Sequence, residues 1–60
     1  MMMRTYQVYL TDPKGKRWFE PVLSPSDAGV LADLRRRLAR EGLEEIRVEY
    51  QGRLLFTLVQ

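Results

Sequence analysis

The sequence has 60 residues and a formal net charge of +2, and it contains neither Cys nor His. The absence of these residue types excludes disulfides, thiolate nucleophiles, the commonest zinc ligands and the commonest general base. A chain this short forms one domain, residues 1–60, near the lower size limit at which a single core is sufficient. We therefore expect no metal, no cofactor and no enzymatic activity, and we expect self-association to add stability.

The charges are unevenly distributed along the chain. Residues 1–40 carry eight basic and four acidic side chains, whereas residues 41–60 carry two basic and four acidic ones. This division allows a partner, or a second copy of the chain, to bind electrostatically. No apolar run has the length of a signal peptide or a membrane span, so we expect a cytoplasmic protein without a membrane partner.

Residues 4–10 alternate between apolar and other side chains, which predicts a half-buried strand. The turn over residues 12–15 has Pro13 at its second position and Gly15 at its end. These two residues favour a three-residue hairpin loop with a bulge. The residues that we expect on the core face of this first strand are Tyr6, Val8 and Leu10.

The predicted loop determines the register of the second strand, residues 17–23. Trp18 then lies opposite Leu10 on the core face, and Phe19 lies opposite Tyr9 on the other face. Pro21 has no backbone N–H, so we expect this strand at an edge of the sheet.

Residues 24–42 carry the signals of one α-helix. Ser24 is predicted as the N-cap, Pro25 as the first helical residue, and Asp27 as the acidic member of a capping box. Gly42 predicts the left-handed residue that ends the helix. The apolar stripe at helical spacing, which we expect to pack on the sheet, consists of Leu31, Leu34 and Leu38.

The second hairpin has two alternative turns. A two-residue turn at Gln51 and Gly52 would place Val48 opposite Leu55 and leave Phe56 beside Arg47. A three-residue loop over 50–52 instead collects the apolar residues on one face, so we prefer it. That face would carry Ile46, Val48, Leu54, Phe56 and Leu58.

Together these elements predict an α+β fold, a two-layer ββαββ sandwich with one helix on a four-stranded mixed sheet. The final strand is apolar on both faces, which favours a central position for it. A right-handed crossover then gives the strand order 2-1-4-3, with strands 1 and 4 parallel. In element order alone this topology resembles the small β-grasp modules, such as bacterial immunoglobulin-binding domains, and the resemblance implies no function.

The sheet face opposite the helix is the first candidate functional surface, because one helix covers only one face. An exposed face that holds two aromatic and two aliphatic residues is typical of an interface rather than of scattered exposure. A solvated face with β-forming residues is the alternative interpretation. We expect a homodimer, or contact with another protein, centred on Tyr9, Phe19, Leu55 and Val59, with pairing of exposed edge strands as the second choice of geometry.

The basic residues offer a second function, nucleic-acid binding. Arginines on one helix face can contact phosphates, and a basic hairpin tip can reach a groove. The residues concerned are Lys14, Lys16, Arg17, Arg36, Arg37 and Arg40. Against this function, Asp33 and Glu41 lie at ion-pair spacing to Arg37, and the chain has no helix-turn-helix, RNA-binding or zinc-knuckle signature.

Two further residues allow a chemical interpretation. Trp18, between basic neighbours, could stack on a base, but its register favours a role as a plug at one end of the core. Glu20 falls on the nominal core face, where Arg4 or Arg35 could pair with it. No second polar group converges on Glu20 from the spacing, and no glycine-rich phosphate loop is present, so neither catalysis nor a small-molecule substrate is expected.

Overall fold

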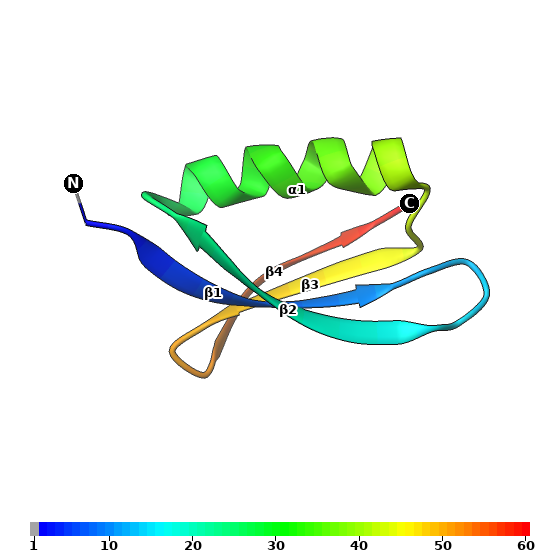
Figure 1. Ribbon diagram of the computed structural model, residues 1–60, viewed down its shortest axis with the longest axis horizontal. Coiled ribbons are helices and arrows are strands. Elements are labelled where there is room, and N and C mark those ends of the chain that lie inside the picture. The colour runs from blue at the N-terminus through cyan, green and yellow to red at the C-terminus, as the bar shows by residue number, and fades with distance from the viewer. Residues whose placement is uncertain (1) are drawn as a thin grey trace.

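The computed structural model describes residues 2–60 and shows two layers, one helix and one four-stranded sheet (Figure 1). The α+β class, with one helix packed on four strands, is confirmed. Within residues 2–60 no helix combines the length and the apolar character that crossing a membrane requires. The elements in chain order are β1 (Arg4–Thr11), β2 (Arg17–Ser24), α1 (Asp27–Glu41), β3 (Glu45–Tyr50) and β4 (Arg53–Val59).

The strand order is β2-β1-β3-β4, and every pairing is antiparallel. The predicted order 2-1-4-3 and the predicted mixed sheet are therefore wrong, and the topological resemblance to β-grasp modules does not hold. The physical reason lies in β3, whose Ile46 and Val48 are fully buried. An antiparallel sheet can face water on one side, so the charged residues that alternate with these two do not require an edge.

The first hairpin has the predicted register, with Leu10 opposite Trp18. Asp12 N–H donates to the Lys16 carbonyl at 2.9 Å, and Gly15 N–H donates to the Asp12 carbonyl at 3.0 Å. Gly15 has a φ of 85°, the left-handed conformation that completes this loop. The position of β2 at an edge of the sheet is confirmed.

The second hairpin closes through a two-residue turn rather than the predicted three-residue loop. Tyr50 pairs with Arg53, which leaves Gln51 and Gly52 as the turn. Both turn residues have positive φ, 51° and 79°. This is the pattern of a type I′ turn, whose twist matches that of the flanking strands.

A β-bulge in β4 restores the apolar face that the three-residue loop was meant to provide. Glu49 pairs with Leu54, but its neighbour Val48 pairs with Phe56, so Leu55 is the extra residue. Beyond the bulge Phe56 and Leu58 lie on the helix side, as Val48 does. The predicted loop is wrong, whereas the shared face of Val48 and Phe56 is right.

The helix begins two residues later than predicted. Ser26, not Ser24, is the N-cap, and its hydroxyl accepts the Gly29 N–H at 3.0 Å. Ser24 remains paired in the sheet at the end of β2, and its hydroxyl donates to the Ser26 carbonyl at 3.1 Å rather than accepting a helix N–H. Pro25 therefore precedes the cap rather than following it. The predicted end at Gly42 is confirmed, with a φ of 64°.

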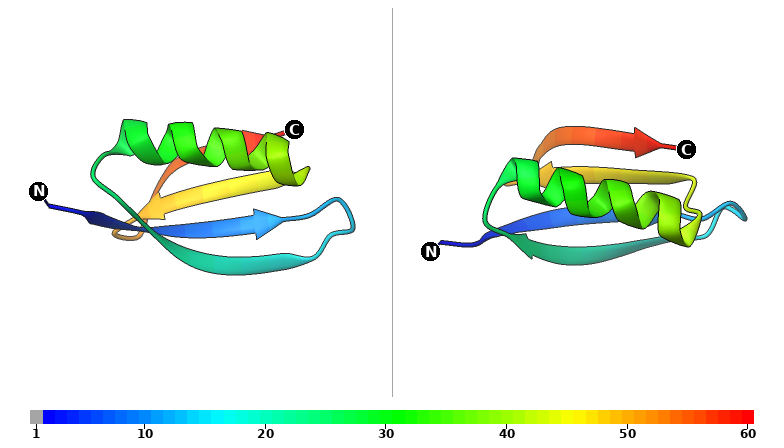
Figure 2. Two further views of the ribbon diagram at one scale, coloured as in Figure 1. Left: turned by 45° about the horizontal axis from the view of Figure 1, so that its top comes forward. Right: turned by 90° about the horizontal axis from the view of Figure 1, so that it is seen from above.

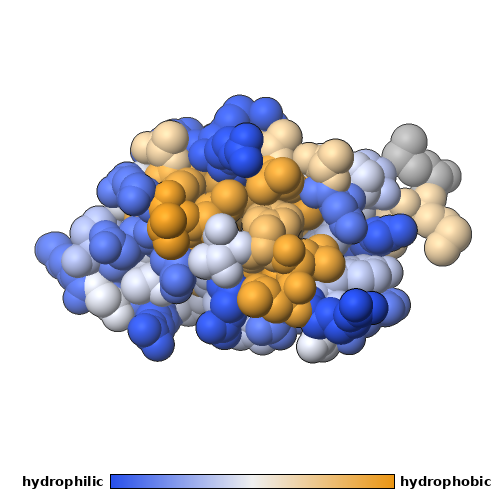
Figure 3. Space-filling model, turned by 180° about the vertical axis from the view of Figure 1, so that it is seen from behind, coloured by the Kyte–Doolittle hydropathy of each residue, from blue (hydrophilic) through white to orange (hydrophobic). Residues whose placement is uncertain are grey.

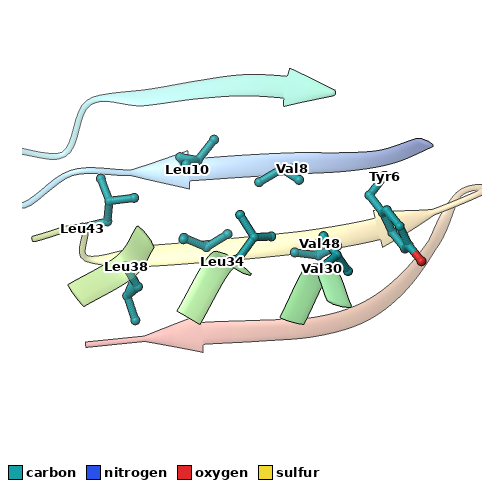
Figure 4. Close-up of a cluster of buried hydrophobic side chains, with 9 residues drawn as sticks. Tyr6, Val8, Leu10, Val30, Leu34, Leu38, Leu43 and Val48 are labelled. Carbon is teal, nitrogen blue, oxygen red and sulfur yellow. The ribbon is translucent and has the colours of Figure 1, made fainter. Parts of the chain in front are cut away.

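The core lies between α1 and the two central strands (Figure 4). Val30 is buried, whereas Leu31, which the predicted stripe included, is only half-buried. Among residues 2–60, neither β2 nor β4 contributes a buried hydrophobic side chain to this cluster. Its members are Tyr6, Val8, Leu10, Val30, Leu34, Leu38, Leu43, Ile46 and Val48.

The helix crosses the sheet diagonally and does not cover all four strands. Seen from above, α1 passes over β3 and β1 and ends near β2, whereas β4 lies beside the helix (Figure 2, right). This placement leaves Phe56 and Leu58, the two β4 residues that pack against the core, only half-buried. The helix therefore covers β4 only in part.

Candidate interaction surface

An aromatic cluster occupies the sheet face opposite the helix. The rings of Tyr9 and Phe19 lie 5.4 Å apart between centroids, and the Arg47 guanidinium lies 4.8 Å from the Tyr9 centroid. The register explains the contacts, because Tyr9 is paired with Phe19 on one side and with Arg47 on the other. Phe19 remains 50% exposed. The cluster therefore offers an aromatic surface with one fixed cation.

A shallow cavity of about 270 Å³ adjoins this cluster at the end of the sheet near the first hairpin. Its lining includes the side chains of Tyr9, Arg17, Phe19 and Arg47. Every buried side-chain polar atom within residues 2–60 already has a hydrogen-bond partner. The cavity therefore presents no unpaired buried polar group that a ligand could bind. In the same part of the chain no three acidic side chains come together as a metal site.

The second apolar surface lies along β4. Leu54 is 59% exposed and Val59 is 66% exposed, and Leu55 between them also reaches solvent. Seen from behind, where β4 faces the viewer, apolar surface gathers over this strand and continues up to the flank of α1 (Figure 3). Exposed aliphatic residues in one continuous region, beside half-buried core residues, are typical of a contact surface.

The structure divides the predicted interface into these two parts. It brings Tyr9 into contact with Phe19, and it places Leu55 and Val59 together on β4. Between the two pairs runs the outward side of β3, which carries Arg47 with an acidic residue before and after it. The predicted interface residues thus share one sheet but do not form one apolar patch.

Sequence reasoning missed part of the β4 surface. Leu54 was assigned to the core face, but the bulge at Leu55 pairs it with Glu49 and leaves it exposed. Leu23, at the end of β2, is also 64% exposed. A bulge has no reliable local signal here, because RLLFTLV contains neither Gly nor Pro to indicate where the extra residue falls.

The opposite edge of the sheet is closed by a polar network. Arg37 donates two hydrogen bonds to the Glu20 carboxylate, at 2.9 and 2.8 Å, and the Trp18 indole N–H donates a third at 2.7 Å. The donation from Arg37, and then that from Trp18, lowers the pKa of Glu20 to about 2. Glu20 therefore pairs with neither of its expected partners, Arg4 and Arg35, and its network joins α1 to β2.

A second network fastens the beginning of the helix. The Tyr6 hydroxyl donates to Asp27 at 2.5 Å, and Arg4 donates to the same oxygen at 3.2 Å. Burial, and then the hydrogen bond to Asp27, raise the pKa of Tyr6. Arg4 also lies over the Tyr50 ring. These contacts connect α1 with β1 and β3, and sequence spacing gave no indication of them.

The helix arginines of the predicted nucleic-acid surface are paired within the molecule. Arg37 contacts both Glu20 and Glu41, and its side chain is only 21% exposed. Arg36 pairs with Asp33, and Arg40 lies 3.5 Å from Glu41 rather than near Glu44. These pairs leave little unbalanced positive charge on the helix.

The basic hairpin tip lies at the same end of the molecule as the C-terminal end of α1 (Figure 1). Lys14, Lys16 and Arg17 are all exposed there. The backbone N–H groups of Lys14 and Lys16 donate to the Asp12 carboxylate, which places a negative charge inside the tip. Acidic side chains therefore accompany the predicted basic residues, Asp12 in the hairpin tip and Glu20, Asp33 and Glu41 as ion-pair partners of the helix arginines.

No family model, no curated protein and no solved structure matches this chain.

Proposed function

We propose that this chain is a non-enzymatic protein-interaction domain that forms a homodimer through the apolar surface of its sheet. One observation carries the proposal: α1 covers β4 only in part, and the strand exposes Leu54, Leu55 and Val59 beside two half-buried core residues. A domain of 60 residues without a disulfide has a small hydrophobic core and therefore a low free energy of unfolding. Burial of apolar surface against a second copy commonly raises that free energy.

The aromatic cluster is a separate exposed surface on β1 and β2, the two strands farthest from β4 in the sheet, and the proposed dimer leaves it free. Phe19 is half exposed, and Tyr9 is already held by Phe19 and Arg47. A preformed aromatic pair costs little side-chain entropy on binding, which suits it to a separate contact with another protein.

Nucleic-acid binding has less support as a second function. The three helix arginines of this surface are each paired with an acidic side chain, and Asp12 lies within the hairpin tip that carries the other three basic residues. A phosphate surface needs an excess of positive charge, because affinity comes from the release of counterions.

The test is the molar mass in solution, measured by sedimentation over a range of concentrations at low and high salt. We expect a mass of twice 7.1 kDa that persists at high salt, because apolar contact is not screened. A monomer at every concentration would overturn the proposal. A dimer that dissociates steeply with salt would indicate an electrostatic contact instead.

A further inference from the structure

We infer that two copies of this chain pair β4 against β4 in the antiparallel sense, so that two four-stranded sheets become one continuous eight-stranded sheet. The inference rests on the proposed function and adds the way in which the surface is used. The second copy joins through backbone hydrogen bonds at a sheet edge, and the side chains on both faces of β4 pack across the join.

The backbone of β4 is the first argument. β4 is the last strand in the order, so one side of it faces no other strand among residues 2–60. Its seven residues span about 24 Å at the usual rise per residue. Edge strands are normally protected by Pro, Lys, inward-pointing charges or a bulge; β4 has only the bulge at Leu55 besides the Arg at its start, so the regular stretch from Phe56 to Val59 carries no such protection.

The side chains supply the second argument. Phe56 and Leu58 face the helix side and pack against the core but are only half-buried, because α1 covers them only in part. Antiparallel pairing keeps each residue on its own face, so the same two residues of the second copy would extend the core across the join. The outer side of the join would bury Val59 in the same way.

Charge supplies the third argument, and it favours a second copy over an unrelated strand. The only charge on β4 is Arg53 at its first position, while Glu45 is paired with Val59 at its other end and Glu44 precedes it. A two-fold axis between the paired β4 strands, perpendicular to the sheet, brings the basic end of each copy to the acidic end of the other. Within residues 2–60 none of these three residues has an ion-pair partner.

The surface around β4 is large enough for the area that each copy must bury in a stable dimer. A specific dimer buries about 800 Å² on each partner, which is about a fifth of the 4271 Å² accessible surface of this chain. The contact must therefore include the flank of α1 as well as β4. Apolar surface continues from β4 to that flank (Figure 3).

The assembly would close at two copies. After β4 has paired, the free edges of the eight-stranded sheet are the two β2 strands. Pro21 has no N–H to offer along that edge, and the Glu20–Arg37 network joins it to the helix. An isologous contact with blocked outer edges gives a dimer rather than a filament.

The chain has no native Cys, so single-cysteine variants provide the test. Thr57→Cys places a thiol on the middle of β4, and Phe19→Cys is the matched control at an exposed position on β2. Each variant is treated with a short thiol-to-thiol crosslinker at a concentration where the mass is dimeric. Circular dichroism verifies the fold of each variant.

We expect Thr57→Cys to give a covalent dimer at least ten times faster than Phe19→Cys, because pairing holds the two β4 strands within reach of each other. Equal rates, or faster crosslinking of Phe19→Cys, would overturn the β4 pairing while the dimer itself, and so the proposed function, stands. A monomeric mass with no crosslinking in either variant would overturn both.

Hydrogen exchange of the unmodified chain keeps the inference testable if a variant fails to fold. We expect the amides of β4 to exchange up to about 100-fold more slowly when the concentration is raised to about 100 times Kd. A dimer whose β4 amides exchange at the rate of the monomer would contradict the pairing.

Discussion

The two edge strands of the sheet carry similar half-buried apolar residues but meet solvent in different ways. On β2, Trp18 and Arg37 of the helix both donate hydrogen bonds to Glu20. Pro21 has no backbone N–H, which reduces the number of donors along this edge. On β4, no residue of the helix forms an ion pair or side-chain hydrogen bond with the strand among residues 2–60.

This difference separates two ways of completing a small sheet. The chain closes one edge with its own helix, through polar contacts 17 residues apart in sequence. It leaves the other edge with an unpaired strand backbone and exposed aliphatic residues. Exposed apolar area alone does not distinguish the edges, because Phe19 and Leu23 of β2 are also exposed. What distinguishes the β4 edge from the β2 edge is its unpaired backbone and the lack of polar contacts between the strand and the helix.

The largest expected effect comes from placing charge on the open edge. Leu55→Glu with Val59→Glu should weaken dimerisation at least 100-fold, because two carboxylates would be desolvated in each half of the contact. Phe19→Glu should change the dissociation constant by less than tenfold, because that residue lies at the other edge. Sedimentation equilibrium measures both constants. An equal loss in the two variants would show that the edges are not different.

The second prediction concerns opening the closed edge. Pro21→Val supplies a backbone N–H to β2, so the variant should form species larger than a dimer as its concentration rises. Thr5→Val is the control, since it adds a β-branched apolar side chain without adding a donor. Light scattering after size separation measures the mass of each. A Pro21→Val chain that stays dimeric would show that Pro21 does not block this edge.

The third prediction tests the polar closure of β2 through pH. The folded pKa of Glu20, about 2, lies below its ordinary value, so its contribution to stability is present above about pH 4.5 and is lost as the pH falls towards 2. The carboxylate is 36% exposed, so solvent screening reduces this contribution to about 1 kcal/mol.

We therefore expect Glu20→Gln to lower Tm by about 4–8 °C at pH 7 and by nothing measurable near pH 2. Thermal melts followed by circular dichroism at one fixed protein concentration give the comparison. Asp33→Asn removes a carboxylate that is paired only with the exposed Arg36, so it should leave Tm nearly unchanged at both values of pH. A difference in Tm between Glu20→Gln and the unmodified chain that persists at pH 2 would mean that the effect does not come from the charge of the Glu20 carboxylate.

The smallest expected effect belongs to the charge at the start of β4. Arg53→Gln should weaken the dimer about two- to fivefold at low salt, as expected of an exposed ion pair at an interface rim. The difference should vanish at high salt, where such pairs are screened. Dissociation constants at two salt concentrations test this. A loss that is independent of salt would mean that Arg53 contributes through packing.

Local chemistry made part of the fold predictable. The turn with Pro13 and Gly15 determines the register of the first hairpin, and Gly42 ends the helix, because each signal acts on residues close to it. The strand order was not predictable in this way. Both orders keep the two hairpins intact, so they differ only in contacts between distant segments.

The prediction for β4 failed for an instructive reason. Apolar residues on both faces of a strand indicate that both faces are buried, but they do not indicate whether the same chain buries them. β4 is an edge strand of this sheet. In the proposed dimer it would lie at the centre of the joined sheet, which is the environment that its sequence favours.

The candidate surface was predictable only in outline. The alternation along β1 and β2 brought Tyr9 and Phe19 together as expected. The bulge at Leu55 and the division of the outer face by Arg47 depend on how β3 meets its two neighbours, which no local pattern records. The same holds for the pairing of Glu20 with Arg37.

The position of Trp18 allows unfolding to be followed by the intrinsic fluorescence of the chain. It is the single tryptophan of the chain, and its indole is bonded to a carboxylate that the helix also holds. Its fluorescence should therefore change when α1 separates from β2. β4 lies at the other edge of the sheet and contains no aromatic residue except Phe56, so joining two copies there should leave the emission unaltered. Unfolding and dissociation can thus be followed separately, without any label, in a single titration.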